Sequence, residues 1–261
     1  SRDWSSDVCS SDLDTASNHA LDAGTEGIAS TLEALEANGI GHSGTARSQE
    51  EGAAMIAPFE VKGIKVSHLA YTRTLNTEDP PDAWVLWRYR SPEQVADDVR
   101  AARQAGAELV ILSLHVGVEM QPWVEPNDLQ YVRAITDLVK VDLVVMHGPH
   151  VVHRVSRVNG TLVYWSVGNF VSGMGVSGSG RYADPRTLDG LIASARFTET
   201  APGTFEVEPA PIALCVDPVS RKVYAAGRAL AAEGDDAVTG RLRAVLQGCV
   251  RRTRALVPDV A

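Results

Sequence analysis

Short apolar runs alternate with amphipathic stretches through most of the chain. Residues 109–114, 143–146 and 162–167 are almost wholly apolar, which is typical of buried strands. Residues 25–38, 91–106 and 127–140 carry apolar side chains three and four positions apart, which predicts helices. Strand, loop and helix follow one another repeatedly, and this order favours an α/β fold with part of the sheet parallel.

Weaker patterns fill the rest of the chain. We expect a helix over residues 48–54 and strands over 40–44, 55–61 and 64–71, with Lys62 and Gly63 in a hairpin turn. Residues 72–90 read as a long loop of the kind that borders a site. Strands are predicted over 188–198, 204–216 and 219–225, and a helix over 236–256. The Gly- and Ser-rich residues 172–187 suggest a flexible lid, with Arg181 as an anion contact in the pocket.

The N-terminal segment differs from everything that follows it. Residues 1–13 have neither helical nor strand periodicity and repeat Ser-Ser-Asp, so we interpret them as a non-native leader. On this interpretation the native N-terminus is missing, together with any signal peptide. Residues 14–261 are then expected to form a single domain, with its core over 15–225 and a C-terminal helix over 236–256.

Charge and composition exclude some classes of protein. The net charge of −9 and the pI near 5.3 argue against a nucleic-acid partner, because phosphates require a basic face. No window approaches the roughly 20 apolar residues that span a bilayer. Cys215 and Cys249 match no metal or redox motif; a disulfide between them would suit an exported protein, whereas two buried free thiols are the default expectation.

Histidine and amide side chains gather at the ends of the predicted strands. Imidazole and amide or carboxylate oxygen suit zinc, manganese or iron, and the carboxyl ends of strands in an open α/β sheet form one edge where ligands bind. Any one of these residues alone fits a hydrogen-bonding role. Their combination predicts a metal site, and the residues are Asn18, His19, His115, Glu119, His147, His150 and Asn169.

Four segments give the chain a specific resemblance. They are SNHALDAG, LHVGVE, HGPHVV and YWSVGNF, and together they resemble the CapA family of capsule and poly-γ-glutamate synthesis proteins, over about residues 15–170. That family resembles the calcineurin-like metallophosphoesterases. The resemblance implies a four-layer αββα sandwich of two mixed β-sheets flanked by helices, here truncated at the N-terminus, with two divalent metal ions (Mn, Fe or Zn) in the full-length protein.

The same resemblance implies roles for individual residues. Asn18, His115, His147 and His150 would be metal ligands, and His19 the general acid near the leaving group. Glu119 and Asn169 would line the pocket. The acidic ligands that such sites need, a Gly-Asp and an Asn-x-Glu, do not precede Asn18, so this chain is expected to hold a partial site and to lack full activity.

Two functions follow as hypotheses. One is a metal-dependent phosphoesterase-like hydrolase of capsule or poly-γ-glutamate synthesis at the cell envelope or the extracellular face. The other is a non-catalytic accessory protein that binds an anionic or carbohydrate envelope polymer, or an export complex. Trp84, Trp87 and Trp123 would suit a sugar or polymer platform, although buried packing is the commoner role of tryptophan.

Overall fold

The computed structural model describes residues 12–175, 183–233 and 238–260. The chain divides into two compact units: unit 1 comprises Ser1–His115 and Ala134–Asp142, and unit 2 comprises Val116–Arg133 and Leu143–Ala261. Helix α4 (Pro126–Leu138) contributes residues to both.

Unit 1 combines parallel and antiparallel strand pairs with three whole helices among its described residues. Strands β1 (Asp12–Asp14) and β2 (Gly41–Ser43) pair in parallel. Strand β4 (Ile64–Thr72) pairs antiparallel with β3 (Phe59–Val61) and parallel with β5 (Leu109–His115). The helices are α1 (Gly24–Ala37), α2 (Gln49–Ala54) and α3 (Pro92–Gln104).

The unit 1 helices follow from local sequence. Ser48 and Ser91 are the N-cap residues of α2 and α3, and each accepts a hydrogen bond from the backbone N–H three residues later. Ile28 and Leu32 face inward from α1 because they lie four residues apart on one helical face. They pack in an apolar cluster that includes Leu86.

The described strands of unit 2 fall into three hydrogen-bonded groups. Strand β8 (Thr161–Tyr164) pairs in parallel with β6 (Leu143–His147) and antiparallel with β7 (Val155–Val158). A three-stranded antiparallel sheet has the order β13 (Val223–Ala225), β12 (Ile212–Val216), β9 (Asp189–Ile192), and the 3₁₀ turn η2 (Pro185–Leu188) precedes β9. Strands β10 (Ala195–Ala201) and β11 (Thr204–Pro209) form a hairpin.

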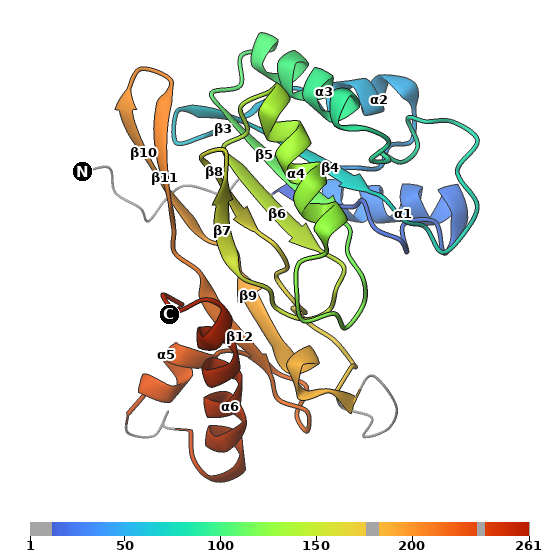
Figure 1. The fold of residues 1–261 in the computed structure, drawn as a ribbon. Coiled ribbons are helices and arrows are strands. Elements are labelled where there is room, and N and C mark those ends of the chain that lie inside the picture. The colour runs from blue at the N-terminus through green and yellow to red at the C-terminus, as the bar shows by residue number, and fades with distance from the viewer. Residues whose placement is uncertain (1–11, 176–182, 234–237, 261) are drawn as a thin grey trace. The chain divides into compact units, whose positions relative to one another are not determined.

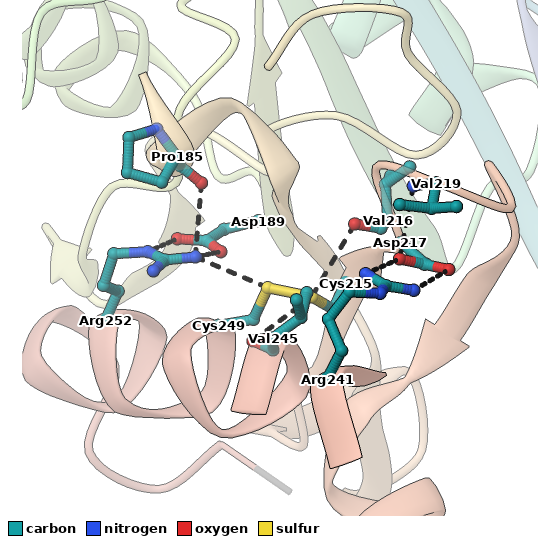
Figure 2. Close-up of a disulfide and its surroundings, with 10 residues drawn as sticks. All are labelled: Pro185, Asp189, Cys215, Val216, Asp217, Val219, Arg241, Val245, Cys249 and Arg252. Atoms are coloured by element: carbon teal, nitrogen blue, oxygen red, sulfur yellow. Dashed lines mark hydrogen bonds and ion pairs between the residues drawn. A yellow bond between two sulfur atoms is a disulfide. The ribbon is translucent and has the colours of Figure 1, made fainter. Parts of the chain in front are cut away.

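A disulfide joins a strand to a helix in unit 2. Helices α5 (Ala226–Ala231) and α6 (Gly240–Leu256) lie beside β12 (Figure 1). Cys215 of β12 is bonded to Cys249 of α6, with their Cα atoms 5.8 Å apart, and both residues are fully buried (Figure 2). The expectation of two free thiols is therefore wrong. The sequence could not show this, because a separation of 34 residues does not reveal which elements pack together.

Several predicted elements are confirmed and others are corrected. The α/β fold with mixed sheets is confirmed, while the four-layer sandwich stays a prediction. The single strands expected over 188–198 and 204–216 are wrong: each is two strands in different sheets. Pro209 and Pro211 interrupt the second run, since proline lacks the N–H that a ladder needs. Strands β1 and β7 and helix α5 were not predicted.

Candidate functional site

The segment that follows β6 carries two of the predicted ligands. His147 is the last residue of β6, and its carbonyl accepts a hydrogen bond from the N–H of Val116 at 2.9 Å. At Gly148, which has φ +127°, a Cβ would lie only 2.5 Å from the Val116 carbonyl oxygen. Glycine is therefore required for the two backbones to approach. The N–H of Met120 bonds to the Pro149 carbonyl at 2.8 Å, which completes the contact.

His150 and Asn169 form the central contact of the unit 2 site. The Nδ1 atom of His150 lies 2.8 Å from Oδ1 of Asn169. His150 has φ +63°, a left-handed conformation that is uncommon for a residue with a side chain. Asn169 is buried, and its Nδ2 donates to the carbonyls of Thr187 at 3.0 Å and of His150 at 3.3 Å.

These hydrogen bonds fix the protonation pattern of the imidazole. Because Nδ2 of Asn169 faces two carbonyl oxygens, its Oδ1 must be the atom that faces His150, and an amide oxygen only accepts. Nδ1 of His150 therefore carries a proton, so whenever the ring holds a single proton Nε2 keeps its lone pair. This is how proteins orient a metal-ligating or basic histidine: the second nitrogen is held by an oxygen.

The backbone of strand β9 packs closely against the turn that contains Asn169. At Gly190 a Cβ would lie 2.1 Å from the carbonyl oxygen of Asn169. At Gly168, which has φ +66°, a Cβ would lie 2.5 Å from the Asp189 carbonyl oxygen. The backbone N–H of Asn169 bonds to that same oxygen at 3.3 Å. Only glycine at both positions allows the turn and the strand to approach this closely.

The side chain of Asp189 connects this strand to the C-terminal helix. Its carboxylate accepts hydrogen bonds from Nε and Nη2 of Arg252 in α6 at 2.7 and 2.6 Å (Figure 2). Burial raises the pKa of Asp189 to about 6, and the partly exposed guanidinium of Arg252 opposes this rise without cancelling it. The backbone and side chain of one residue thus join the Asn169 turn to α6.

Unit 1 contains a second polar network. Nδ1 of His19 donates to the Asp22 carboxylate at 2.6 Å, which orients an otherwise exposed ring. Nδ2 of Asn18 donates to Oδ1 of Asn76 at 3.0 Å, and the Asn76 N–H donates to the Asn18 carbonyl at 3.0 Å. Nδ2 of Asn76 lies 3.3 Å from Nε2 of His19. The network therefore gathers both residues of the Asn-His motif around Asn76.

The other predicted residues have less informative surroundings. His115 is the last residue of β5 and half-buried, and its carbonyl accepts a hydrogen bond from the N–H of Arg73 at 3.1 Å. Glu119 is exposed in unit 2. Arg181 and the central part of the predicted lid lie outside the described residues.

The three histidines that match no ligand position each lie beside a polar group. His68 Nε2 lies 2.8 Å from the Ser113 hydroxyl, within unit 1. His153 is buried, and its Nε2 donates to the Gln121 carbonyl at 2.7 Å. Burial lowers the pKa of His153. His42 lies near Glu51, with 3.7 Å between Nε2 and the carboxylate.

A metal ion would need more ligands than any single cluster supplies. Within the ranges that the structure describes, no three His, Cys, Asp or Glu side chains form a group that could hold one. His150 fits a ligand role, because Asn169 holds its Nδ1 and no contact of its Nε2 occurs among the described residues. Asn18 and His115 belong to unit 1, whereas His147 and His150 belong to unit 2. The metal site therefore stays a prediction.

Sequence patterns did not identify several residues of the site. Asp22 was detectable, because it follows His19 by three residues in the Asn-His segment. Asn76 was not, because it lies 57 residues from His19 in an irregular loop. Gly190 had a partial signal: the Asp-Gly-Leu-Ile stretch continues the family resemblance weakly, and the structure shows that its glycine accommodates Asn169.

Comparisons with known proteins give a consistent result. The family described as "Bacterial capsule synthesis protein PGA_cap" matches residues 7–174. The PGA biosynthesis protein CapA of Bacillus subtilis is 26% identical over 202 residues, which cover 77% of this chain and 50% of that protein. The capsule biosynthesis protein CapA of Bacillus anthracis is 22% identical over 205 residues, covering 76% and 46%.

A third relative carries a different kind of name. It is a probable polyglutamine synthesis accessory protein of Mycobacterium tuberculosis, 26% identical over 172 residues, which cover 60% of this chain and 43% of that protein. The chain thus spans about half the length of the curated relatives it matches. No helix among the described residues has the length and apolar character to cross a membrane.

Proposed function

Because the chain belongs to the bacterial capsule synthesis protein PGA_cap family, we propose that it is a metal-dependent phosphoesterase-like hydrolase of capsule or poly-γ-glutamate synthesis at the cell envelope. The observation that carries this proposal is the hydrogen bond from Nδ1 of His150 to Asn169, since no described residue then occupies Nε2 of His150. The names of the Bacillus relatives support the biological setting.

The proposed ligands are Asn18, His115, His147 and His150, and the proposed fold is a metallophosphoesterase-like sandwich. Divalent ions (Mn, Fe or Zn), when bound there, would stabilise developing charge on a phosphoryl group and lower the pKa of a bound water. Imidazole nitrogen and amide oxygen are suitable ligands for these ions.

His19 is the proposed general acid. Asp22 holds its Nδ1, so in the doubly protonated ring the proton on Nε2 would be the one given to the oxygen of the departing group. The exposure of His19 gives substrate access to that proton. Glu119, Asn169 and Arg181 are proposed to line the same pocket, with Asn169 acting through the orientation of His150.

The disulfide supports a location outside the reducing cytosol. Disulfides form and persist in oxidising compartments, and Cys215 and Cys249 are joined. This fits the cell envelope or its outer face, where an anionic or carbohydrate polymer, a phosphoester and an envelope synthesis or export complex are the proposed partners.

Metal content and phosphodiester turnover test the proposal directly. The purified chain, incubated with Mn²⁺ or Zn²⁺ and then desalted, should retain metal and hydrolyse bis(p-nitrophenyl) phosphate at a low rate, because its expected metal site is partial. His150→Ala and His115→Ala should lose both properties, whereas His19→Ala should retain metal but lose turnover. His68→Gln is the matched control, because His68 contacts Ser113 instead. Equal turnover in the wild type and all site variants would disprove the hydrolase.

The second candidate is a non-catalytic accessory protein that binds a polymer or an export complex. The name of the Mycobacterium tuberculosis relative specifically favours it. Under this function the chain would bind a capsular polymer or poly-γ-glutamate without turning over any phosphodiester, and His19→Ala would leave that binding unchanged.

A further inference from the structure

Unit 1 contains a cavity of about 420 Å³ that is separate from the Asn18 and His19 network. Its walls come from α2, from the irregular residues 83–90 and from the start of α3. The volume lies within the range of small-molecule sites, which combine apolar and aromatic walls with a few polar groups. The family resemblance assigns no role to this region.

Two tryptophans supply the aromatic wall. Trp84 and Trp87 are half-buried and flank Val85 and Leu86, which are buried in the core and therefore fix the segment. The ring of Trp87 stacks on Tyr71, with centroids 5.4 Å apart.

The backbone of α2 approaches this wall closely. A Cβ at Gly52 would lie 3.1 Å from Cβ of Trp84, so the small residue brings α2 against the tryptophan. Tyr71 holds the ring of Trp87, and Trp84 packs against the apolar cluster that includes Leu86. Both side chains are therefore ordered before any ligand arrives, which reduces the entropic cost of binding.

Two arginines provide hydrogen-bond donors. Arg88 is anchored by an ion pair with Asp79 and by a bond from Nη2 to the Arg73 carbonyl at 2.7 Å. Its Nε is buried and has no hydrogen-bond partner among the described residues. Because that atom has no accessible surface, Arg88 contributes to the wall of the cavity through the rest of its anchored side chain. Arg90 is exposed, and no ion pair or hydrogen bond of its guanidinium occurs among the described residues.

Gln94 and Asp98 complete the polar side. Oε1 of Gln94 accepts the backbone N–H of Arg90 at 3.1 Å, which turns its amide group toward the irregular segment 83–90. Oδ2 of Asp98 accepts the Tyr71 hydroxyl at 2.9 Å. The cavity therefore presents amide, carboxyl and guanidinium groups beside the indoles, which is a mixed set of donors and acceptors.

We propose that this cavity binds an acidic sugar unit, a hexuronate residue of a polysaccharide. The C–H face of a pyranose ring packs on the negative face of an indole. The hydroxyl groups suit the amide and carboxyl groups of Gln94 and Asp98, and the ring carboxylate suits the guanidinium of Arg90, which binds carboxylates through two parallel hydrogen bonds. A γ-glutamyl chain also carries carboxylates, but it has no ring to cover the tryptophans.

Calorimetric titration of the full chain tests this site, independently of any hydrolase activity. The ligands are oligomers of glucuronate, uncharged glucose oligomers of equal length, and γ-glutamyl oligomers. The uronides should bind most tightly and quench tryptophan fluorescence. Arg90→Gln should weaken uronide binding at least about tenfold, because a charge-assisted contact is lost, and should leave glucose binding unchanged.

Two further variants distinguish binding at this cavity from effects of net charge or of unfolding. Arg100→Gln removes the same charge from α3, but Arg100 pairs with Asp97 and does not line the cavity, so binding should not change. Ala53→Trp places a bulky side chain on the exposed rim of α2 and should abolish binding while circular dichroism shows an intact fold. The proposal is wrong if Arg90→Gln or Ala53→Trp binds uronides normally, if no ligand binds, or if glucose or γ-glutamyl oligomers bind as tightly as the uronides.

Discussion

Nδ1 of His150 donates to Oδ1 of Asn169 at 2.8 Å, and this single contact determines which imidazole nitrogen is free. Because both donors of the Asn169 amide are occupied by carbonyls, the side chain cannot rotate without losing them. We therefore expect nitrogen chemical shifts of wild-type His150 to report the tautomer protonated at Nδ1. A predominant Nε2-protonated tautomer would contradict the assigned geometry.

Replacement of Asn169 by alanine should remove this control. The carbonyls of Thr187 and His150 would lose their donors, and the free energy of unfolding should fall by about 1–3 kcal/mol. The tautomers of His150 should become mixed. Urea denaturation measures the first effect and nitrogen shifts the second. Asn127→Ala, at an exposed position of α4, is the control and should stay within about 0.5 kcal/mol of wild type.

A methyl group at Gly190, in strand β9, should disturb the turn that contains Asn169. Its Cβ would lie 2.1 Å from the carbonyl oxygen of Asn169, so the backbone must move. Gly190→Ala should destabilise the fold by about 1–3 kcal/mol or more, as measured by urea denaturation. Gly173→Ala is the matched control, since a Cβ there meets nothing within 4 Å. Equal stability of the two variants would contradict the close approach.

The fold was predictable where the sequence has strong periodicity and not where geometry depends on distant partners. The runs that became β5 and β6, and the predicted helix that became α3, were visible directly. The runs after residue 188 were not resolved into β9 to β12, because apolar content does not tell one long strand from two strands with different partners. The residues that orient the site were harder still: Asn76 orients Asn18 from a loop 58 residues away, and nothing local marks it.

The disulfide should contribute substantially to the stability of the chain. It closes a loop of 34 residues, and a loop of this size corresponds to about 3–4 kcal/mol from restriction of the unfolded chain. Reduction with dithiothreitol should therefore lower the urea midpoint. The variant with Cys215→Ala and Cys249→Ala together should show the lower midpoint with or without reductant. An unchanged midpoint on reduction of the wild type would show that the bond adds no stability.

Two aspartates held by arginines of α6 should give opposite pH dependences. Asp217 accepts two bonds from Arg241 and others from Ser220 and Val219, which hold its pKa well below the ordinary value of 3.8. Its stabilising effect is therefore full above about pH 4 and is lost only as the pH falls through the lower pKa of the folded state. Asp217→Asn should consequently cost most stability at neutral pH and progressively less in acid.

Asp189 should behave in the opposite way, because burial raises its pKa to about 6. Between about pH 4 and pH 6 the native state binds a proton that the unfolded chain has already released, so the Asp189 contribution to stability falls as the pH rises through this window. Urea denaturation of wild type and Asp189→Asn at half-unit intervals from pH 4 to pH 7 measures it. The stability of wild type relative to the variant should decline toward pH 6 and then level off. A constant difference across the window would show that Arg252 compensates fully for the burial of the Asp189 carboxylate.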